Sequence, residues 1–110
     1  MLRVSTAAAR LGISSDAVLG RASENEILLL TTSRGTRLVP ESHIREGSMV
    51  PGLSNLLVRL SRAPFSPWTK AAWLATPLVS LGMKSPLDFL QSEKDYQLLW
   101  DVAAMYSEEV

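Results

Sequence analysis

The sequence lacks the residues on which several classes of protein depend. It has no cysteine and one histidine, His43. Disulfides and thiolate metal sites are therefore excluded, and one histidine cannot by itself form a zinc centre or a histidine-based catalytic triad. We expect no metal, no cofactor and no enzymatic activity. We interpret His43, in the stretch PESHIREG, as a solvated or capping residue of a short helix rather than a ligand.

The chain also lacks an overall charge and a long apolar run. It has 11 basic and 11 acidic residues, which gives a formal net charge of +0. No global field therefore draws it towards nucleic acid or a membrane surface. No run approaches the ~20 apolar residues of a spanning helix, and MLRVSTAAARLGIS has no apolar segment typical of a signal peptide. We expect a cytoplasmic protein without a membrane partner.

The charges that are present are unevenly distributed. Residues 1–50 carry six arginines and five acidic residues, whereas residues 85–110 carry one lysine and six acidic residues. With 110 residues, of which 46% are hydrophobic, the chain is long enough for one ordinary domain or two very small ones. We expect the two ends of the chain to have different tasks.

Helix signals dominate the start of the chain. Ser5 is a favoured N-cap, Gly12 is a stop signal, and Ser14 is a second N-cap. They predict a helix from about residue 5, a tight turn, and a second helix over residues 15–22 with Val18 facing inward and Ile13 in the corner. This is the spacing of a helix-turn-helix, in which glycine supplies the turn.

A hairpin is predicted next. The stretch EILLLTTSRGTRLVP contains a β-rich run, a Ser-Arg-Gly turn and a short second run that ends at Pro40. Arg34 and Arg37 would lie at or beside the tip of this hairpin. The alternative is that the helices and hairpin form a small module whose polar residues are merely solvated.

The order of helix, turn, helix and two-stranded wing resembles the excisionase and MerR-like class of DNA-binding domain. The resemblance rests on STAAARLGIS, RGTRLVPESHI and the apolar spacing between them. It implies that the second helix enters the major groove with Ser15, Asp16 and Arg21, and that Arg34 and Arg37 contact phosphates or the minor groove. The few phosphate contacts predict weak affinity per chain, so a dimer on a repeated half-site would be needed.

The second half begins at REGSMVPG, where glycine, serine and Pro51-Gly52 interrupt the chain before a helical pattern. We place the boundary between domains 1–47 and 48–110 there. An amphipathic helix follows, with Leu53, Leu56, Leu57 and Leu60 at helical spacing. Ser66-Pro67 then predicts the start of another helix, because proline at the first helical position loses no hydrogen bond. Together with the first half, these signals predict a mainly α fold: a helix-turn-helix with a small β-hairpin, then a helical bundle.

Two further short helices are predicted by residues that start and end helices. Thr76-Pro77 would start one helix and Gly82 would end it, and Ser85-Pro86 would start the next, with Asp88 in its first turn. A final helix is predicted over about residues 93–107. Its apolar side chains cover about 260° of the circumference, which is more than one core contact requires. Either this helix runs through the middle of a cluster or part of its surface meets another protein chain.

Residues 48–110 resemble the toxin-binding domain of the Xre/MbcA/ParS antitoxins, the partners of RES-domain toxins. The matching residues come in a fixed order: Trp73, Leu74, Thr76, Pro77, Leu81, Gly82, Ser85, Pro86, Leu87, Asp88 and Leu90. Leu78 stands where the family usually has asparagine, and the family's N-terminal domain is usually all-helical.

The resemblance implies an antitoxin that sterically blocks a cognate RES-domain toxin that attacks NAD, and that represses its own operon. Carried over by position, the structural motif is Trp73, Leu74, Pro77 and Gly82. The toxin contacts would be Ser85, Pro86, Leu87, Asp88, Tyr106, Glu108, Glu109 and Val110.

Two other functions remain open. The chain could be a stand-alone transcriptional regulator whose C-terminal helices only dimerise. An enzyme with Asp88 and Asp101 as a carboxylate pair is disfavoured, because no base, nucleophile or oxyanion donor converges with them.

Overall fold

The chain folds into two compact units in a computed structural model, which describes residues 1–93 and 95–108. The N-terminal unit spans Met1–Val50 and the C-terminal unit spans Pro51–Val110. Six α-helices and short strands lie in the described residues, so the expected mainly α class is confirmed. None of these helices is both long and apolar enough to cross a membrane.

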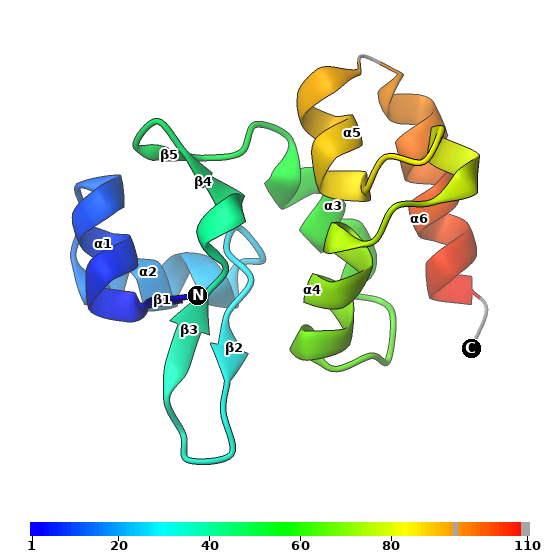
Figure 1. Cartoon of the computed structure of the whole chain (residues 1–110). Helices are drawn as coiled ribbons and strands as arrows, with labels where there is room; N and C mark the ends of the chain where they lie inside the picture. The colour runs from blue at the N-terminus through cyan, green and yellow to red at the C-terminus, as the bar shows by residue number, and fades with distance from the viewer. Residues whose placement is uncertain (94, 109–110) are drawn as a thin grey trace. The chain divides into compact units, whose positions relative to one another are not determined.

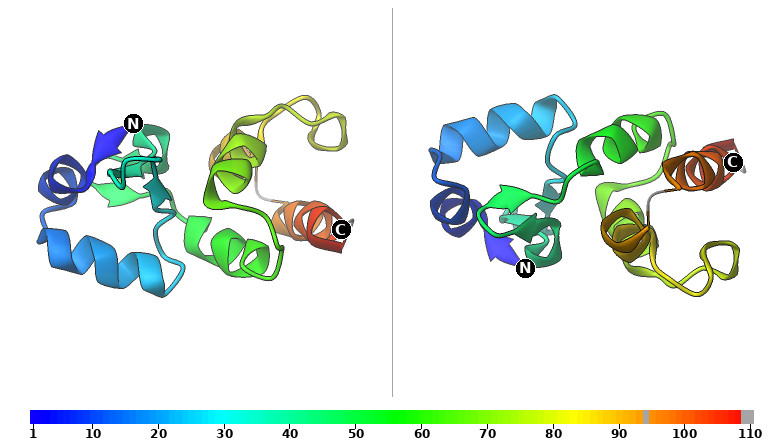
Figure 2. Two further views of the ribbon diagram at one scale, coloured as in Figure 1. Left: turned by 90° about the horizontal axis from the view of Figure 1, so that it is seen from below. Right: turned by 90° about the horizontal axis from the view of Figure 1, so that it is seen from above.

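Two helices joined by a tight turn begin the N-terminal unit (Figure 1). They are α1 (Val4–Leu11) and α2 (Ser15–Ser23), and Figure 2 shows α1 nearly end-on while α2 runs across the view, so the two cross steeply. Gly12 ends α1 at φ 68°, a left-handed conformation that glycine adopts without a steric cost.

The N-caps of these two helices differ in how well the sequence predicts them. Ser14 caps α2 as expected, because its side chain accepts a hydrogen bond from the Ala17 amide. The prediction that Ser5 caps α1 is wrong: the cap residue is Arg3, without a side-chain hydrogen bond. Leu2 and Arg3 are held in a strand, so the chain already leaves an extended conformation at Val4.

A three-stranded antiparallel sheet completes the helix-turn-helix. It has the order β1-β3-β2, with β1 at Leu2–Arg3, β2 at Leu30–Thr31 and β3 at Arg37–Val39. Strands β2 and β3 form the expected hairpin, and its turn is closed by hydrogen bonds between Thr32 and Thr36 (2.9 Å) and between Gly35 and Thr32 (2.9 Å). The pairing of β1 with β3 ties the N-terminus to this hairpin.

A second hairpin was not predicted. The 3₁₀ helix η1 (Glu41–His43) leads into β4 (Ile44–Arg45), which pairs with β5 (Ser48–Met49). Glu46 and Gly47, the two turn residues, have φ of 52° and 81°, which matches the type of two-residue turn that suits the twist of a hairpin. The residues at the predicted domain boundary are therefore structured.

The core of the N-terminal unit is small and aliphatic. All aromatic residues of the chain come at Phe65 or later, so this unit has none. Val18 is fully buried and Ile13 packs against the core, both as expected. The buried cluster consists of Leu2, Ala7, Ala8, Val18, Ile27 and Val39.

The C-terminal unit contains four α-helices. The helix α3 (Leu53–Leu60) buries the whole predicted stripe of Leu53, Leu56, Leu57 and Leu60, and it packs against α6. The helix α4 (Pro67–Ala75) starts as predicted, with the Ser66 side chain accepting from the Thr69 amide.

The segment after α4, which contains the predicted helix start and stop signals, forms a 3₁₀ turn and a short helix. Gly82 ends the turn η2 (Val79–Leu81) as predicted, but this turn begins after Leu78 and not at Pro77. The helix α5 (Pro86–Ser92) has the expected cap, in which the Ser85 side chain accepts from the Asp88 amide (3.1 Å). Thr76 ends α4 instead of starting a helix, and its hydroxyl donates to the Ala72 carbonyl (2.6 Å).

The last helix, α6 (Tyr96–Glu108), runs antiparallel to α5 in Figure 1. It begins later than the predicted residue 93, because Glu93 terminates α5 and Asp95 accepts a hydrogen bond from the Leu98 amide (3.1 Å). Leu99 and Ala103 are fully buried, so the middle of the apolar arc faces the core.

We expect Ser85→Ala to lower the stability of the C-terminal unit by about 1 kcal/mol, because it removes the cap of α5. All three tryptophans lie in this unit, so urea unfolding followed by tryptophan fluorescence measures it. Ser80→Ala is the control, since Ser80 is exposed within η2 and caps no helix. Equal midpoints for the two variants would contradict the role of the cap.

Candidate functional site

The N-terminal half of α2 is exposed to solvent. Ser15 and Asp16 occupy its first turn, and both side chains are exposed. At about 100° per residue, both lie within about 60° of Leu19 around the helix. This face has the position of a recognition helix, but Asp16 adds a negative charge to it.

A shallow hollow lies between α2 and the β2–β3 hairpin. It is lined by residues from three places: Arg3 to Ser5 at the start of α1, Leu19 of α2, and Gly35 to Arg37 of the hairpin. Its volume is about 320 Å³. Leu19 and the hairpin therefore border the same surface, which we call the wing–helix surface (Arg3, Ser15, Asp16, Leu19 and Arg37).

Two arginines border this hollow, and one of them was missed in the sequence. Arg37 was predicted as a contact of the hairpin, whereas Arg3 was not considered. Arg3 comes to this surface because β1 pairs with β3, with Arg3 opposite Leu38. The alternation of apolar Leu2 and charged Arg3 was the sequence signal that could have identified it, because it is typical of a strand with one buried face. Arg34 lies in the turn at the hairpin tip and is exposed.

Arg21 does not join the wing–helix surface. It lies about 160° from Leu19 around α2, since neighbouring residues of a helix are separated by about 100°. Its side chain is exposed. The five predicted DNA contacts are therefore divided: Ser15, Asp16 and Arg37 share one surface, Arg34 extends it at the tip, and Arg21 faces elsewhere.

His43 is a core residue, which corrects the prediction that it is solvated. It ends η1 with 1% of its surface exposed, and its Nδ1 atom has no hydrogen-bond partner among the described residues. Burial lowers the pKa of His43 from 6.5 to about 4, so the imidazole is neutral at pH 7. In the described ranges no three metal-ligating side chains form a group, with His43 or elsewhere.

Three of the predicted toxin contacts are buried. Ser85 is 5% exposed, and Pro86 and Leu87 are also core residues. They hold the start of α5 in place and do not present a surface. Asp88 is exposed in the first turn of this helix.

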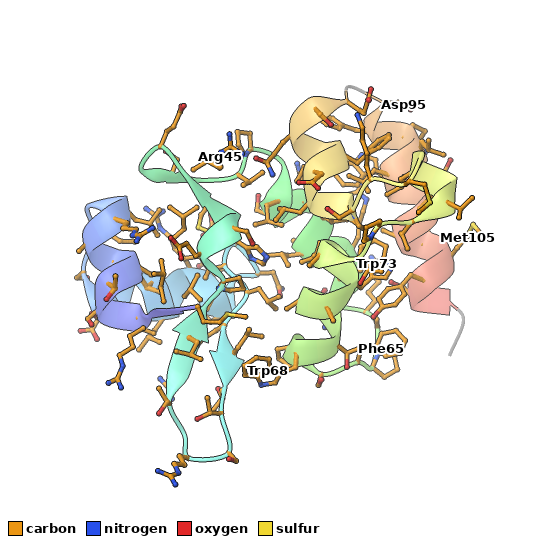
Figure 3. All side chains as sticks on the ribbon, viewed as in Figure 1. Arg45, Phe65, Trp68, Trp73, Asp95 and Met105 are labelled. Atoms are coloured by element: carbon orange, nitrogen blue, oxygen red, sulfur yellow. The ribbon has the colours of Figure 1, made fainter. Side chains whose placement is uncertain are left out.

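Tyr106 is half-buried in an aromatic cluster rather than free in a tail. Its ring lies 4.7 Å from Phe65 and 4.7 Å from Trp73, and it is stacked on the latter at 19°. Figure 3 marks Phe65 and Trp73, which come from the segment before α4 and from α4 itself. Leu74, the neighbour of Trp73, is fully buried, and Trp73 is half-buried. Glu109, Val110 and the side chain of Glu108 lie outside the described residues.

One flank of α6 is apolar and exposed. Leu98 and Met105 lie two turns apart on the same side of the helix, and Met105 is 61% exposed and points outward in Figure 3. The η2 turn packs on α6, and two more exposed apolar residues lie there: Val79 in η2 (84% exposed) and Met83 just after it (63% exposed). We call these four residues the η2–α6 patch.

The η2 turn that carries half of this patch has a closed backbone. The Leu78 amide donates to the Lys84 carbonyl (3.1 Å), and the Met83 amide donates to the Leu78 carbonyl (2.8 Å). Met83 has a φ of 66°, which is uncommon for a residue with a side chain. Exposed apolar residues that gather on one surface are typical of a contact surface.

The comparisons with known proteins concern the fold. The sequence matches no family model and no curated protein. The chain is similar to the NMR structure of Rv2175c, with a TM-score of 0.77 and 20% sequence identity over 96% of this chain and 80% of that chain. At this identity the similarity extends to the fold alone.

We expect the N-terminal unit to lose stability as the pH falls from about 6.5 to about 4. In this window the unfolded chain protonates His43 whereas the folded chain does not, so unfolding takes up a proton. The difference in pKa corresponds to up to about 3 kcal/mol. Above pH 6.5 the stability contribution is complete.

Urea unfolding followed by circular dichroism measures this loss, and tryptophan fluorescence of the same samples follows the C-terminal unit separately. His43→Leu is the matched variant, because leucine is buried without a titrating group. If the wild type and His43→Leu lose stability equally on acidification, His43 is not the cause.

Proposed function

We propose that the N-terminal unit binds DNA as a helix-turn-helix with a wing. The observation that carries the proposal is the wing–helix surface. Leu19 of α2 and the hairpin arginine Arg37 border one hollow, and the exposed Ser15 and Asp16 precede Leu19 by one turn on the same side of α2. A recognition helix flanked by a basic wing contacts base edges with the helix and phosphates with the wing. The structural similarity to Rv2175c supports the fold of the chain on which this proposal rests. It adds nothing about what the chain binds.

The charges of this surface set the expected strength of binding. Arg3, Arg34 and Arg37 are available for phosphates. Asp16 of α2 lies on the wing–helix surface, and its negative charge repels phosphates. Arg10 is held away in an ion pair with Glu41 (3.0 Å). Three phosphate contacts give weak and salt-sensitive affinity per chain, so tight binding needs two copies on a repeated half-site.

We expect the double variant Arg34→Ala, Arg37→Ala to weaken binding to the DNA upstream of its own gene. Each lost phosphate contact reduces the slope of log affinity against log salt by about 1, so the slope falls by about 2. Fluorescence anisotropy over a series of salt concentrations measures it. Arg21→Ala is the control, since this exposed arginine lies on another side of α2 and keeps both wing contacts. A slope that falls as much in the control would exclude the wing as the DNA contact.

We propose further that the C-terminal unit neutralises a RES-domain toxin, which makes the chain an antitoxin that represses its own operon in the cytoplasm. The motif from Trp73 to Leu90 supports this function, and the exposed η2–α6 patch beside it favours a protein partner. The inhibition is steric and needs no cofactor. An acidic segment such as residues 108–110 suits a cleft built for a phosphate-bearing dinucleotide, because both are attracted by the same positive potential.

The alternative function, a stand-alone regulator, uses the same patch differently. Its C-terminal helices would dimerise through Val79, Met83, Leu98 and Met105 and bind no toxin. The two functions differ in what the patch binds: a second protein in one case and a copy of this chain in the other.

We expect Met105→Glu to abolish protection when the chain is co-expressed with the neighbouring toxin gene, because a charge is then buried at the centre of the contact. Cell growth and co-purification of the two proteins measure the effect. Gln97→Glu is the matched control, since it adds the same charge to α6 on its polar strip, where Gln97 bonds Asp101 (2.9 Å).

Point substitutions are a sharper test than removal of residues 105–110. The deletion also removes Tyr106, which packs between Phe65 and Trp73, so it disturbs the fold as well as the surface. Full protection by Met105→Glu would remove the η2–α6 patch from the toxin contact. If the same variant instead lost self-association and no toxin bound, the stand-alone regulator would be favoured.

A further inference from the structure

The other flank of α6 forms a groove with α3 that the proposed toxin contact does not use. The groove has a volume of about 480 Å³ and is lined by Val58, Arg59, Arg62, Trp100, Ala104 and Ser107. Trp100 and Met105 are about 140° apart around α6, so this groove and the η2–α6 patch are separate surfaces.

The groove presents two guanidinium groups that have no carboxylate partner among the residues that the structure describes. Among the described residues the ion pairs join Arg10 to Glu41 and Lys84 to Glu93, so neither Arg59 nor Arg62 takes part in one. Both side chains are exposed, and Val58 beside them is an exposed apolar residue. A surface of this kind is complementary to an acidic segment that also carries an apolar or aromatic side chain.

Arg59 is already held in a fixed orientation. Its guanidinium lies 4.2 Å from the centroid of the Trp100 ring, and its Nη1 donates to the Asn55 carbonyl (3.2 Å). The stacked arginine covers this face of the indole, so a nucleic-acid base does not stack there. A guanidinium fixed against an aromatic ring keeps its outer N–H groups free for a carboxylate.

The chain itself supplies an acidic side chain directly followed by an aromatic one. Asp95 and Tyr96 at the start of α6 are exposed, and residues 85–110 carry six acidic residues and one lysine. The ring of Tyr96 lies 5.9 Å from Trp100, so it borders the same side of α6 as the groove. If two α6 helices pair antiparallel about Trp100, Tyr96 of one copy comes opposite Ala104 of the other, and Asp95, which precedes Tyr96, comes to the same end of the groove.

We propose that this groove binds the start of α6 of a second copy of the chain, which gives a two-fold dimer with two identical contacts. Each copy contributes a groove with Arg59 and Arg62, and each inserts Asp95 and Tyr96 into the groove of the other. Such a self-complementary arrangement closes at two subunits, as a two-fold interface does. The proposal stands independently of a toxin partner, and it supplies the two DNA-binding units that a repeated half-site requires.

The test is a charge exchange in the full chain, followed by sedimentation velocity over a range of concentrations and salt. We expect Arg62→Glu and Asp95→Lys each to raise the dimer dissociation constant by tenfold or more, and the double variant to restore it. Added salt should weaken the wild-type dimer. Arg34→Glu is the matched control, because it reverses the same charge in the wing.

The position of Asp95 at the helix start requires one more variant. Asp95→Lys also removes the hydrogen bond to the Leu98 amide, so circular dichroism checks the helix content. Asp95→Asn keeps a capping side chain and removes the charge, and it should weaken the dimer without a loss of helix.

Three outcomes would overturn the proposal: a monomer at all concentrations, a dimer that Arg62→Glu leaves intact, or single variants that weaken the dimer without rescue in the double variant. Because the toxin contact is tested by Met105→Glu on the other flank, failure of the dimer leaves the proposed antitoxin function unaffected.

Discussion

The packing of α3 against α6 is the contact on which the C-terminal unit depends. α3 contributes a stripe of four buried leucines, and α6 contributes Leu99 and Ala103 from the middle of a much wider apolar arc. α6 also packs on α5 and η2, and these contacts leave two flanks of its arc exposed. One flank continues onto η2 as an apolar patch, and the other meets Arg59 of α3 and Arg62, which follows α3. Both candidate partner surfaces therefore lie beside the buried contacts of α6.

The N-terminal unit is held together differently, because it has no aromatic residue. Its core consists of small aliphatic side chains, with the neutral imidazole of His43 buried in the same unit. Such a core buries little area, so the unit gains from backbone pairing: β1 joins the N-terminus to β3, and the β4–β5 hairpin closes its end. The pairing of β1 also brings Arg3 to the hollow beside the wing. A structural device that stabilises the unit thus contributes to its candidate DNA surface.

Much of the fold could be predicted, because its signals are local. Ser14, Ser66 and Ser85 cap helices through amides three residues away, and Gly12 and Gly82 end them through their own φ. The candidate sites were predicted less well. Ser85, Pro86 and Leu87 were predicted to contact a partner protein but are buried, and His43 in a polar stretch is buried too. Burial of a residue depends on contacts with elements that are far away in the sequence. A capping pattern or a run of polar neighbours does not reveal such contacts.

The sequence by itself determined where most helices begin and end, that the first half is a helix-turn-helix with a hairpin, and that the last helix has more apolar surface than one contact uses. These properties depend on the conformational preferences of single residues and on the 3.6-residue period. Only the tertiary structure decided which part of that apolar surface stays exposed, that Arg3 joins Arg37 while Arg21 does not, and that Arg59 stacks on Trp100. In each case the residues are far apart in the sequence and are brought together by strands and helices. Their proximity therefore depends on packing.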